Sequence, residues 1–268
     1  MYPSLISLAV VAYICAMGLA LAYLVQRQDL VHRLAVLTTL AAWAAHTVSL
    51  IVRAVEGGAP PLGNLPDAIW VGVWVIVLLQ LLLEHRTGVR VLGAFVLPIV
   101  VLLSLKATTT GRPGLLAPAL ASAWIWIHIA LAVIGIAAFV FNFVGGIMYL
   151  LQERQLKTKR PGAFYYRLPA LATLDRLTFR TLALGFPFLT VGLMLGALWA
   201  RTAWGSAFTF DPLAFFSLVA WVIYAGTLAG RAAGGWHGRR AAYFAIAGFA
   251  ALVLTLGAGL FLPGRHGS

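Results

Sequence analysis

Eight long apolar segments, separated by short polar loops, constrain the fold of this chain more than any other feature of its sequence. An α-helix needs about 20 apolar residues to cross the hydrocarbon core of a bilayer. Backbone polar groups must find their partners inside such a segment, so the pattern predicts an all-α, polytopic membrane helix bundle of about eight transmembrane helices. The segments cover about 4–25, 34–54, 68–84, 90–106, 122–151, 178–200, 212–231 and 240–261.

The composition agrees with an integral membrane protein. The chain is 62% hydrophobic and only 10% charged, whereas about a quarter of the residues in a soluble domain are charged. The first segment lacks a basic start and a small-residue cleavage site, so we expect a retained span and not a signal peptide. The single cysteine, Cys15, excludes an internal disulfide, a CxxC pair and a thiolate metal cluster.

The basic residues are divided unequally between the two sets of loops. Fourteen of the nineteen lysines and arginines follow odd-numbered segments, and five lie in the set that includes both termini. The positive-inside rule then places the first set in the cytoplasm and both termini outside, in the bacterial inner (cytoplasmic) membrane. The net charge of +12 therefore reflects topology, and we expect no nucleic-acid partner.

An aromatic loop at 199–212 joins the sixth and seventh segments on the predicted outer side. It contains Trp204, Gly205, Phe208, Phe210 and Asp211. A loop this rich in flat rings favours a platform for a flat apolar ligand at the membrane surface over a plain connector. Asp211 stands directly before a proline, where it is a candidate N-cap for the next helix.

One histidine, His128, lies near the outer start of the fifth segment. It follows Trp124 by four residues and therefore shares its helical face. The same face carries Gly135, Asn142 and Tyr149 at steps of seven, a pattern typical of helix packing. An ionisable residue at the membrane edge beside tryptophans is nevertheless a candidate iron ligand.

Two other histidines map to the outer half of the bundle. His46 and Arg53 share one face of the second segment. In one interpretation His46 contacts the edge of a cofactor and Arg53 binds its carboxylates. In the alternative the two residues serve helix packing or snorkelling. His266 lies two residues from the C-terminus, where side chains are usually unstructured.

The remaining side chains indicate no catalytic site. The seven acids lie away from the middle of the segments, so no buried proton relay is predicted. His32, His85 and His237 lie beside arginines in predicted cytoplasmic loops, where solvation explains them. The chain has no phosphate loop, HExxH or GxSxG motif, which excludes the usual hydrolase and ATPase sites.

The order of these features resembles the tryptophan-rich WWD signature of the haem-handling cytochrome c assembly family, which includes the CcsA, CcmC and HemX types. The resemblance extends over most of the chain. It rests on His46 with Arg53 and the loop after them, on His128 and the 149–157 end of its segment, and on the Trp204-Gly205 and Asp211-Pro212 pairs of the aromatic loop.

The resemblance implies a single integral membrane domain, 1–268, whose outer loop 199–212 binds a b-type, non-covalent haem. The implied axial ligands of the iron are His128 and His266, with His46 left open as an alternative to His266. The other implied cofactor-binding residues are Trp124, Trp204, Gly205, Phe208, Phe210, Asp211 and Arg53, and Arg53 or Arg201 would pair with the propionates.

Departures from the family pattern narrow this expectation. Phe208 and Phe210 stand where synthase members carry tryptophan, and Ala229 stands where they carry a histidine. These changes place the chain nearest the small HemX/YpjD-like branch. By itself the chain is not expected to be an enzyme, but at most a part of a haem lyase or cytochrome c synthase system.

The leading hypothesis is a membrane protein that presents haem at the outer face for cytochrome c assembly. Its expected partners are apocytochrome c or another assembly subunit. One alternative is a non-catalytic regulator or scaffold of haem biosynthesis that acts through the basic 152–180 segment. A small-molecule transporter is disfavoured because no acid lies near the middle of a span, where ion coupling would need one.

Overall fold

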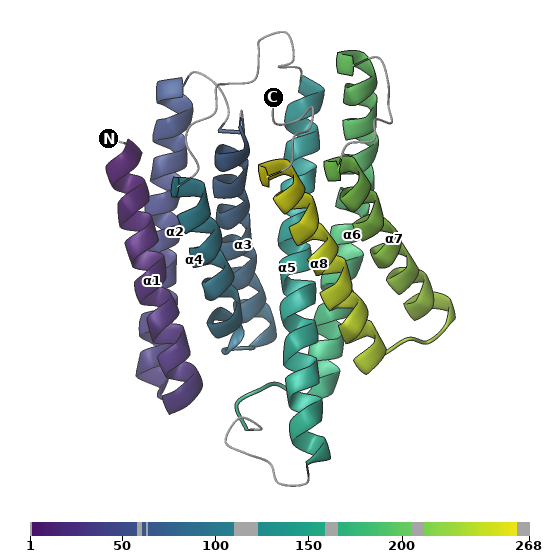
Figure 1. The fold of residues 1–268 in the computed structure, drawn as a ribbon. Coiled ribbons are helices and arrows are strands. Elements are labelled where there is room, and N and C mark those ends of the chain that lie inside the picture. Colours follow the sequence, from purple (N-terminus) through teal and green to yellow (C-terminus); the bar gives the residue numbers. More distant parts are fainter. Residues whose placement is uncertain are drawn as a thin grey trace. The chain divides into compact units, whose positions relative to one another are not determined.

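The computed structural model describes residues 2–57, 61–62, 64–109, 123–158, 166–204 and 212–261. All the regular secondary structure of these residues is helical (Figure 1), which confirms the predicted all-α bundle. The helices are α1 (Tyr2–Gln26), α2 (Asp29–Gly57), α3 (Leu65–Thr87), α4 (Leu92–Thr109), α5 (Ala123–Lys157), α6 (Leu171–Trp204), α7 (Pro212–Ala233) and α8 (Arg239–Phe261).

Seven of the helices in the described ranges are long and apolar enough to cross a membrane. The remaining helix, α4, has a shorter apolar stretch, Leu92–Thr108, as the sequence predicted for the fourth segment. At 35 and 34 residues, α5 and α6 exceed the thickness of a bilayer core. The protein is therefore a multi-pass membrane protein.

Capping residues set the ends of α3, which is longer than its apolar segment. The Asn64 side chain accepts a hydrogen bond of 2.8 Å from the backbone N–H of Asp67 at the start of the helix. At the other end Gly88 adopts the left-handed conformation, with φ of 68°, and its N–H donates to the carbonyl of Glu84. Hydropathy alone underestimates this helix because both ends are polar.

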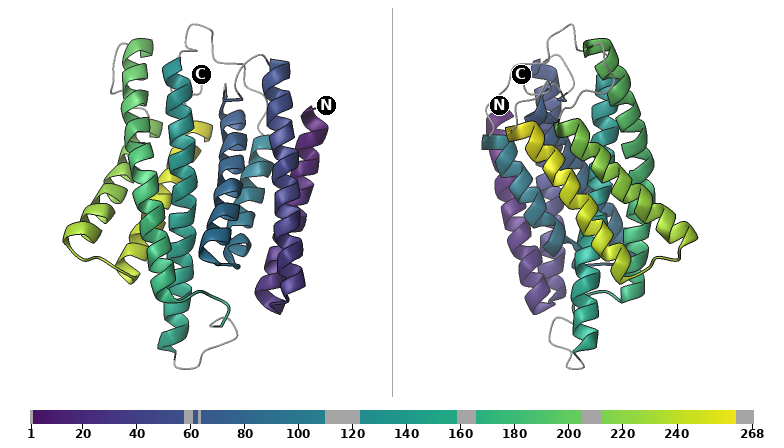
Figure 2. Two further views of the ribbon diagram at one scale, coloured as in Figure 1. Left: turned by 180° about the vertical axis from the view of Figure 1, so that it is seen from behind. Right: turned by 45° about the vertical axis from the view of Figure 1, so that its right-hand side comes forward.

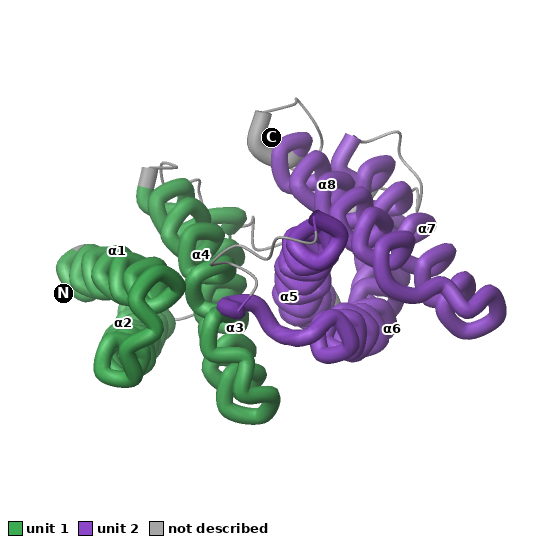
Figure 3. The backbone as a smooth tube through the Cα atoms, turned by 90° about the horizontal axis from the view of Figure 1, so that it is seen from below, with its two compact units in different colours: residues 1–118 green, residues 119–268 purple. Residues whose placement is uncertain are grey.

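The chain divides into two compact units, unit 1 (Met1–Pro118) and unit 2 (Ala119–Ser268), shown in separate colours in Figure 3. In unit 1, α1 packs against α2 and α4, and α3 packs against α2 and α4. In unit 2, α5 packs against α6 and α8, and α7 packs against α6 and α8. Each unit is thus a ring of four helices, and Figure 2 shows α5 and α6 side by side along their length.

A tryptophan–threonine contact joins the second and third helices of unit 1. The indole N–H of Trp74 donates to the Thr47 hydroxyl oxygen at 2.8 Å, and that hydroxyl donates to the carbonyl of Trp43. The rings of Trp43 and Trp74 stack with centroids 5.1 Å apart. These contacts satisfy polar groups that would otherwise be unpaired in an apolar interior.

Unit 2 repeats this contact between its own second and third helices. The indole N–H of Trp221 donates to the Thr190 hydroxyl oxygen at 3.0 Å, and that hydroxyl donates to the carbonyl of Phe186. The Phe186 and Trp221 rings lie 5.8 Å apart. Thr190 follows Phe186 by four residues, as Thr47 follows Trp43. The two units therefore share one plan, and the threonine and tryptophan give a common reference for comparing them.

Candidate functional site

The best-defined candidate ligand is His128, in the second turn of α5, which points toward α6. Its Nδ1 atom lies 2.6 Å from the carbonyl oxygen of Gly192. A carbonyl oxygen only accepts, so Nδ1 carries the proton and the imidazole lone pair lies on Nε2. Metal-binding histidines commonly donate their other ring N–H to a backbone carbonyl in this way. The structure therefore holds His128 in the tautomer that a ligand of iron requires.

Gly196 makes room for this imidazole on α6. A Cβ atom at this position would lie 2.7 Å from Cε1 and 2.9 Å from Nδ1 of His128. Real Cβ atoms do not approach that closely, so any larger residue would displace the ring. The orientation of His128 thus depends on the absence of a side chain at 196.

Gly135 and Asn142, two further residues on the same face of α5 as His128, also contact α6. A Cβ on Gly135 would lie 3.2 Å from the backbone nitrogen of Leu189 in α6. The Asn142 side chain donates to the carbonyl of Thr178 at 2.7 Å. The packing interpretation therefore explains these two positions, while His128 is the member of the face that carries a metal-binding atom.

Residues 205–211 of the predicted aromatic loop lie outside the described residues. This applies to Gly205, Phe208, Phe210 and Asp211, and to His266 near the C-terminus. The side chains of Trp124 and Trp204 are likewise not described. Their predicted roles stay predictions.

The helices that carry the loop are described. Residues 199–204 of the predicted loop instead form the end of α6. The next helix, α7, begins at Pro212, a position at which proline is favoured. The contact between His128 and Gly196 lies eight residues before the end of α6, about 12 Å along its axis. His128 and the loop therefore belong to the same end of unit 2.

His46 lies fully buried in unit 1. Its Nδ1 atom is 3.1 Å from the hydroxyl of Tyr13, and its ring packs edge-on against Trp70 with centroids 4.9 Å apart. The Nε2 atom has no hydrogen-bond partner among the described residues. The ring contacts fit the packing alternative, and the unpartnered nitrogen keeps the ligand alternative open. Sequence reasoning missed Tyr13 and Trp70, because their apolar surroundings give no sign of a polar contact.

Arg53 holds a carboxylate of the protein itself. Its Nη2 atom lies 3.0 Å from Oδ2 of Asp67, which also accepts a hydrogen bond from the Asn64 side chain. The carboxylate that Arg53 contacts belongs to the first turn of α3, which fits the helix-packing alternative, and binding of a cofactor's carboxylate by Arg53 stays a prediction. The pair ties the end of α2 to the start of α3.

The opposite end of each unit carries most of its basic residues, and we call it the basic end. In unit 1 the prediction that His32 is simply solvated is wrong. Its Nδ1 atom lies 3.5 Å from Oε1 of Glu84, and the two side chains are 17% and 10% exposed. Beside them Arg90 contacts Tyr23 and Asp29, and the hydrogen bond to Tyr23 raises the pKa of Arg90 above its usual value.

The basic end of unit 2 carries an ion pair at the matching positions. Arg231 donates to Oδ2 of Asp175 at 2.8 Å, and the Arg231 side chain is only 4% exposed. The other oxygen of Asp175 accepts the backbone N–H of Gly238 at 3.0 Å. The Asp175 carboxylate thus connects the start of α6 to the end of α7 and to the residue before α8.

Comparison with known proteins matches residues 62–264 to the model of the family described as cytochrome c assembly protein. The chain is 29% identical to the cytochrome c biogenesis protein CcsA of Guillardia theta over 250 residues, 85% of this chain and 83% of the relative. It is 31% identical to CcsA of Prochlorococcus marinus (strain MIT 9303) over 265 residues, 87% of this chain and 83% of the relative. The expected assignment to the HemX/YpjD-like branch stays a prediction.

Proposed function

Because this chain belongs to the cytochrome c assembly protein family, we propose that it presents haem at the outer face of the membrane for cytochrome c assembly. The observation that carries the proposal is the hydrogen bond from Nδ1 of His128 to the carbonyl of Gly192. It directs the Nε2 lone pair as an axial ligand of iron needs it.

The chemistry of the residues fits a non-covalent, b-type haem. Bound haem supplies an iron atom with two axial positions, a flat apolar ring and two carboxylates. His128 would hold one axial position, and His266 the other, with His46 as the alternative. Cys15 is the only cysteine, so a pair of thioether bonds to this chain is excluded.

The aromatic loop would supply the surface against which the ring packs. Trp204, Phe208 and Phe210 offer flat apolar faces, with Trp124 and Gly205 beside them and Asp211 shaping the turn into α7. Arg201 would pair with a propionate, and Arg53 would do so only by leaving Asp67. Each of these residues binds or orients haem, and none of them acts as a catalytic base.

The positive-inside rule supports the outer location of this site. The loop 199–212 and both termini belong to the set of connections that is poor in lysine and arginine. In this proposal the chain holds haem on that side, and apocytochrome c or another assembly subunit receives it. Formation of the covalent bonds then depends on the partner.

An absorption spectrum tests the proposal. The full chain is purified in mild detergent from haem-rich cells, and the oxidised and reduced spectra are compared with those of His128→Ala. We expect a low-spin bis-histidine spectrum that the substitution abolishes, and the same comparison with His46→Ala and His266→Ala identifies the second ligand. A colourless wild-type protein that also fails to take up added hemin would overturn the proposal.

A further inference from the structure

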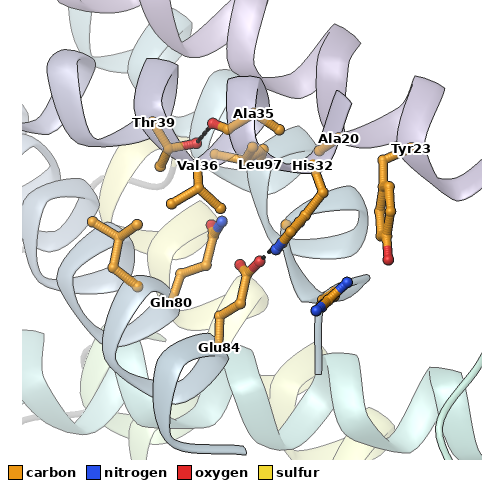
Figure 4. Close-up of a pocket in the computed structure, with 12 residues that line it drawn as sticks. Ala20, Tyr23, His32, Ala35, Val36, Thr39, Gln80, Glu84 and Leu97 are labelled. Atoms are coloured by element: carbon orange, nitrogen blue, oxygen red, sulfur yellow. Dashed lines mark hydrogen bonds and ion pairs between the residues drawn. The ribbon is translucent and has the colours of Figure 1, made fainter. Parts of the chain in front are cut away.

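Three polar side chains converge at the basic end of unit 1 (Figure 4). His32 on α2 faces Glu84 on α3 at 3.5 Å. Gln80 lies one turn before Glu84 and is 2% exposed. The carbonyl oxygen of the Gln80 side chain, Oε1, has no partner among the described residues. A buried acceptor of this kind is stabilised only when a proton donor reaches it.

A small cavity lies beside these groups. Gln80, Glu84 and His32 line it together with Thr39, and its volume of about 10 Å³ is just enough for one water molecule. Gly93 keeps it open, because a Cβ at this position would lie 2.9 Å from Nε2 of Gln80. The site therefore offers room for one water next to an unpaired acceptor, a carboxylate and an imidazole.

The matching position in unit 2 shows what is unusual about this cluster. His32 lies fifteen residues before Thr47, and Asp175 lies fifteen residues before Thr190. Glu84 follows Trp74 by ten residues, and Arg231 follows Trp221 by ten. One plan thus places two facing groups at both basic ends. The arginine of unit 2 is always charged, whereas both members of the pair in unit 1 can gain or lose a proton.

We propose that His32, Glu84 and Gln80 form a proton-binding site at the basic end of unit 1. One proton taken up from water is held between the Glu84 carboxylate and the His32 imidazole, and a water in the cavity links this pair to Oε1 of Gln80. Uptake changes the net charge of the pair from −1 to zero and breaks no other bond.

The surroundings favour a proton over a metal cation. Among the described residues no group of three or more His, Cys, Asp and Glu side chains is arranged to hold a metal ion. Arg90 lines the same cavity, and its positive charge repels a divalent cation about twice as strongly as a single proton. The other groups that face the pair are the Tyr23 hydroxyl from α1 and Asp29 from α2, and Asp29 is neutralised by Arg90 at 2.9 Å.

Infrared difference spectroscopy of the full chain in lipid nanodiscs tests the site and requires no haem. We expect pH steps to reveal the carbonyl stretch of a protonated carboxylic acid, which shifts in D₂O and disappears in Glu84→Gln. In His32→Gln the band should become stronger, because Glu84 no longer shares the single proton with the imidazole.

Asp175→Asn in unit 2 is the matched control and should leave the band unchanged. Gly93→Ala removes no titratable group but fills the cavity, so it should shift the midpoint of the band while the helical circular dichroism stays the same. Gly93→Ala also tests the site if Glu84→Gln does not fold. Absence of the band in the wild type, its survival in Glu84→Gln, or an unchanged midpoint in Gly93→Ala would overturn the proposal.

Discussion

Units 1 and 2 have the same arrangement of four helices but carry different side chains at corresponding positions near the helix ends. Six residues after Thr47, unit 1 has Arg53, which reaches across to Asp67 and closes the α2–α3 connection. Six residues after Thr190, unit 2 has Gly196, against which the His128 imidazole packs. The same position carries a long charged side chain in one unit and no side chain in the other. Unit 2 thus has space for the His128 imidazole where unit 1 has an ion pair that connects two helix ends.

The basic ends show the reverse relationship. Unit 2 locks its helices there with Asp175 and Arg231, whereas unit 1 has the titratable pair of His32 and Glu84 beside a small cavity. Each unit therefore has an arginine–aspartate ion pair at one end. At its other end each unit has a histidine side chain, His32 in unit 1 and His128 in unit 2. The hydrogen bond from a tryptophan to a threonine, in the middle of the helices, is common to both units.

The largest effect is expected from Gly196→Ala, which places a side chain where unit 2, unlike unit 1, has none. The new Cβ would displace the His128 ring and its hydrogen bond to Gly192. Loss of such an orienting contact lowers metal affinity by about 10-fold to 100-fold. Hemin titration followed by absorption measures the change. Gly192→Ala is the control, because its Cβ would meet Ala132 at an ordinary 3.5 Å; equal affinities in the two variants would contradict the role of Gly196.

Arg53→Ala tests the closed end of unit 1. It leaves the nearly buried Asp67 carboxylate without its guanidinium partner. We expect a loss of about 1–2 kcal/mol in the free energy of unfolding, with partial exposure of Arg53 limiting the effect. Thermal unfolding in detergent measures it, and Asp29→Ala, at an exposed pair, serves as the comparison. If Arg53→Ala destabilises no more than Asp29→Ala, the closure of this end does not depend on the ion pair.

The tryptophan–threonine hydrogen bond that both units share predicts similar effects of its removal in each unit. Trp74→Phe and Trp221→Phe each keep an aromatic ring but remove the hydrogen bond to a threonine. Each should lower the free energy of unfolding by about 0.5–1.5 kcal/mol. The comparison is made by thermal unfolding of both variants under one set of conditions. An effect in only one unit would show that the contact is structurally equivalent but not energetically so.

The smallest effect is expected from Glu153→Gln at the basic end of α5. Glu153 pairs with the exposed Lys157 one turn later at 2.8 Å and lies 3.9 Å from Arg239. An exposed pair at this spacing contributes about 0.3–0.5 kcal/mol, and salt screens it. The shift in unfolding temperature should therefore shrink as the salt concentration is raised. A large, salt-independent loss would show that this end of unit 2 has an additional structural role.

The sequence predicted the helices well because a membrane segment must be apolar throughout its length. It underestimated α3, whose ends depend on the capping contacts of Asn64 and Gly88. It also singled out His128 as a candidate iron ligand from its position at the membrane edge, and that role stays a prediction. It could not predict the acceptor of His128, because the backbone carbonyl of Gly192 has no signature in a sequence. The pairing of His32 with Glu84 was missed for a related reason, since their contact forms only when α2 packs against α3.

The hydrogen bond that orients His128 also determines when its rotational freedom is lost. The imidazole is fixed by Gly192 and Gly196 as the chain folds, whereas a mobile side chain loses about 0.5–1.5 kcal/mol of conformational entropy on binding. When a ligand departs, the ring keeps its orientation and needs no reordering before the next one arrives. Such a site is suited to repeated loading and release, because the same preformed geometry serves every cycle.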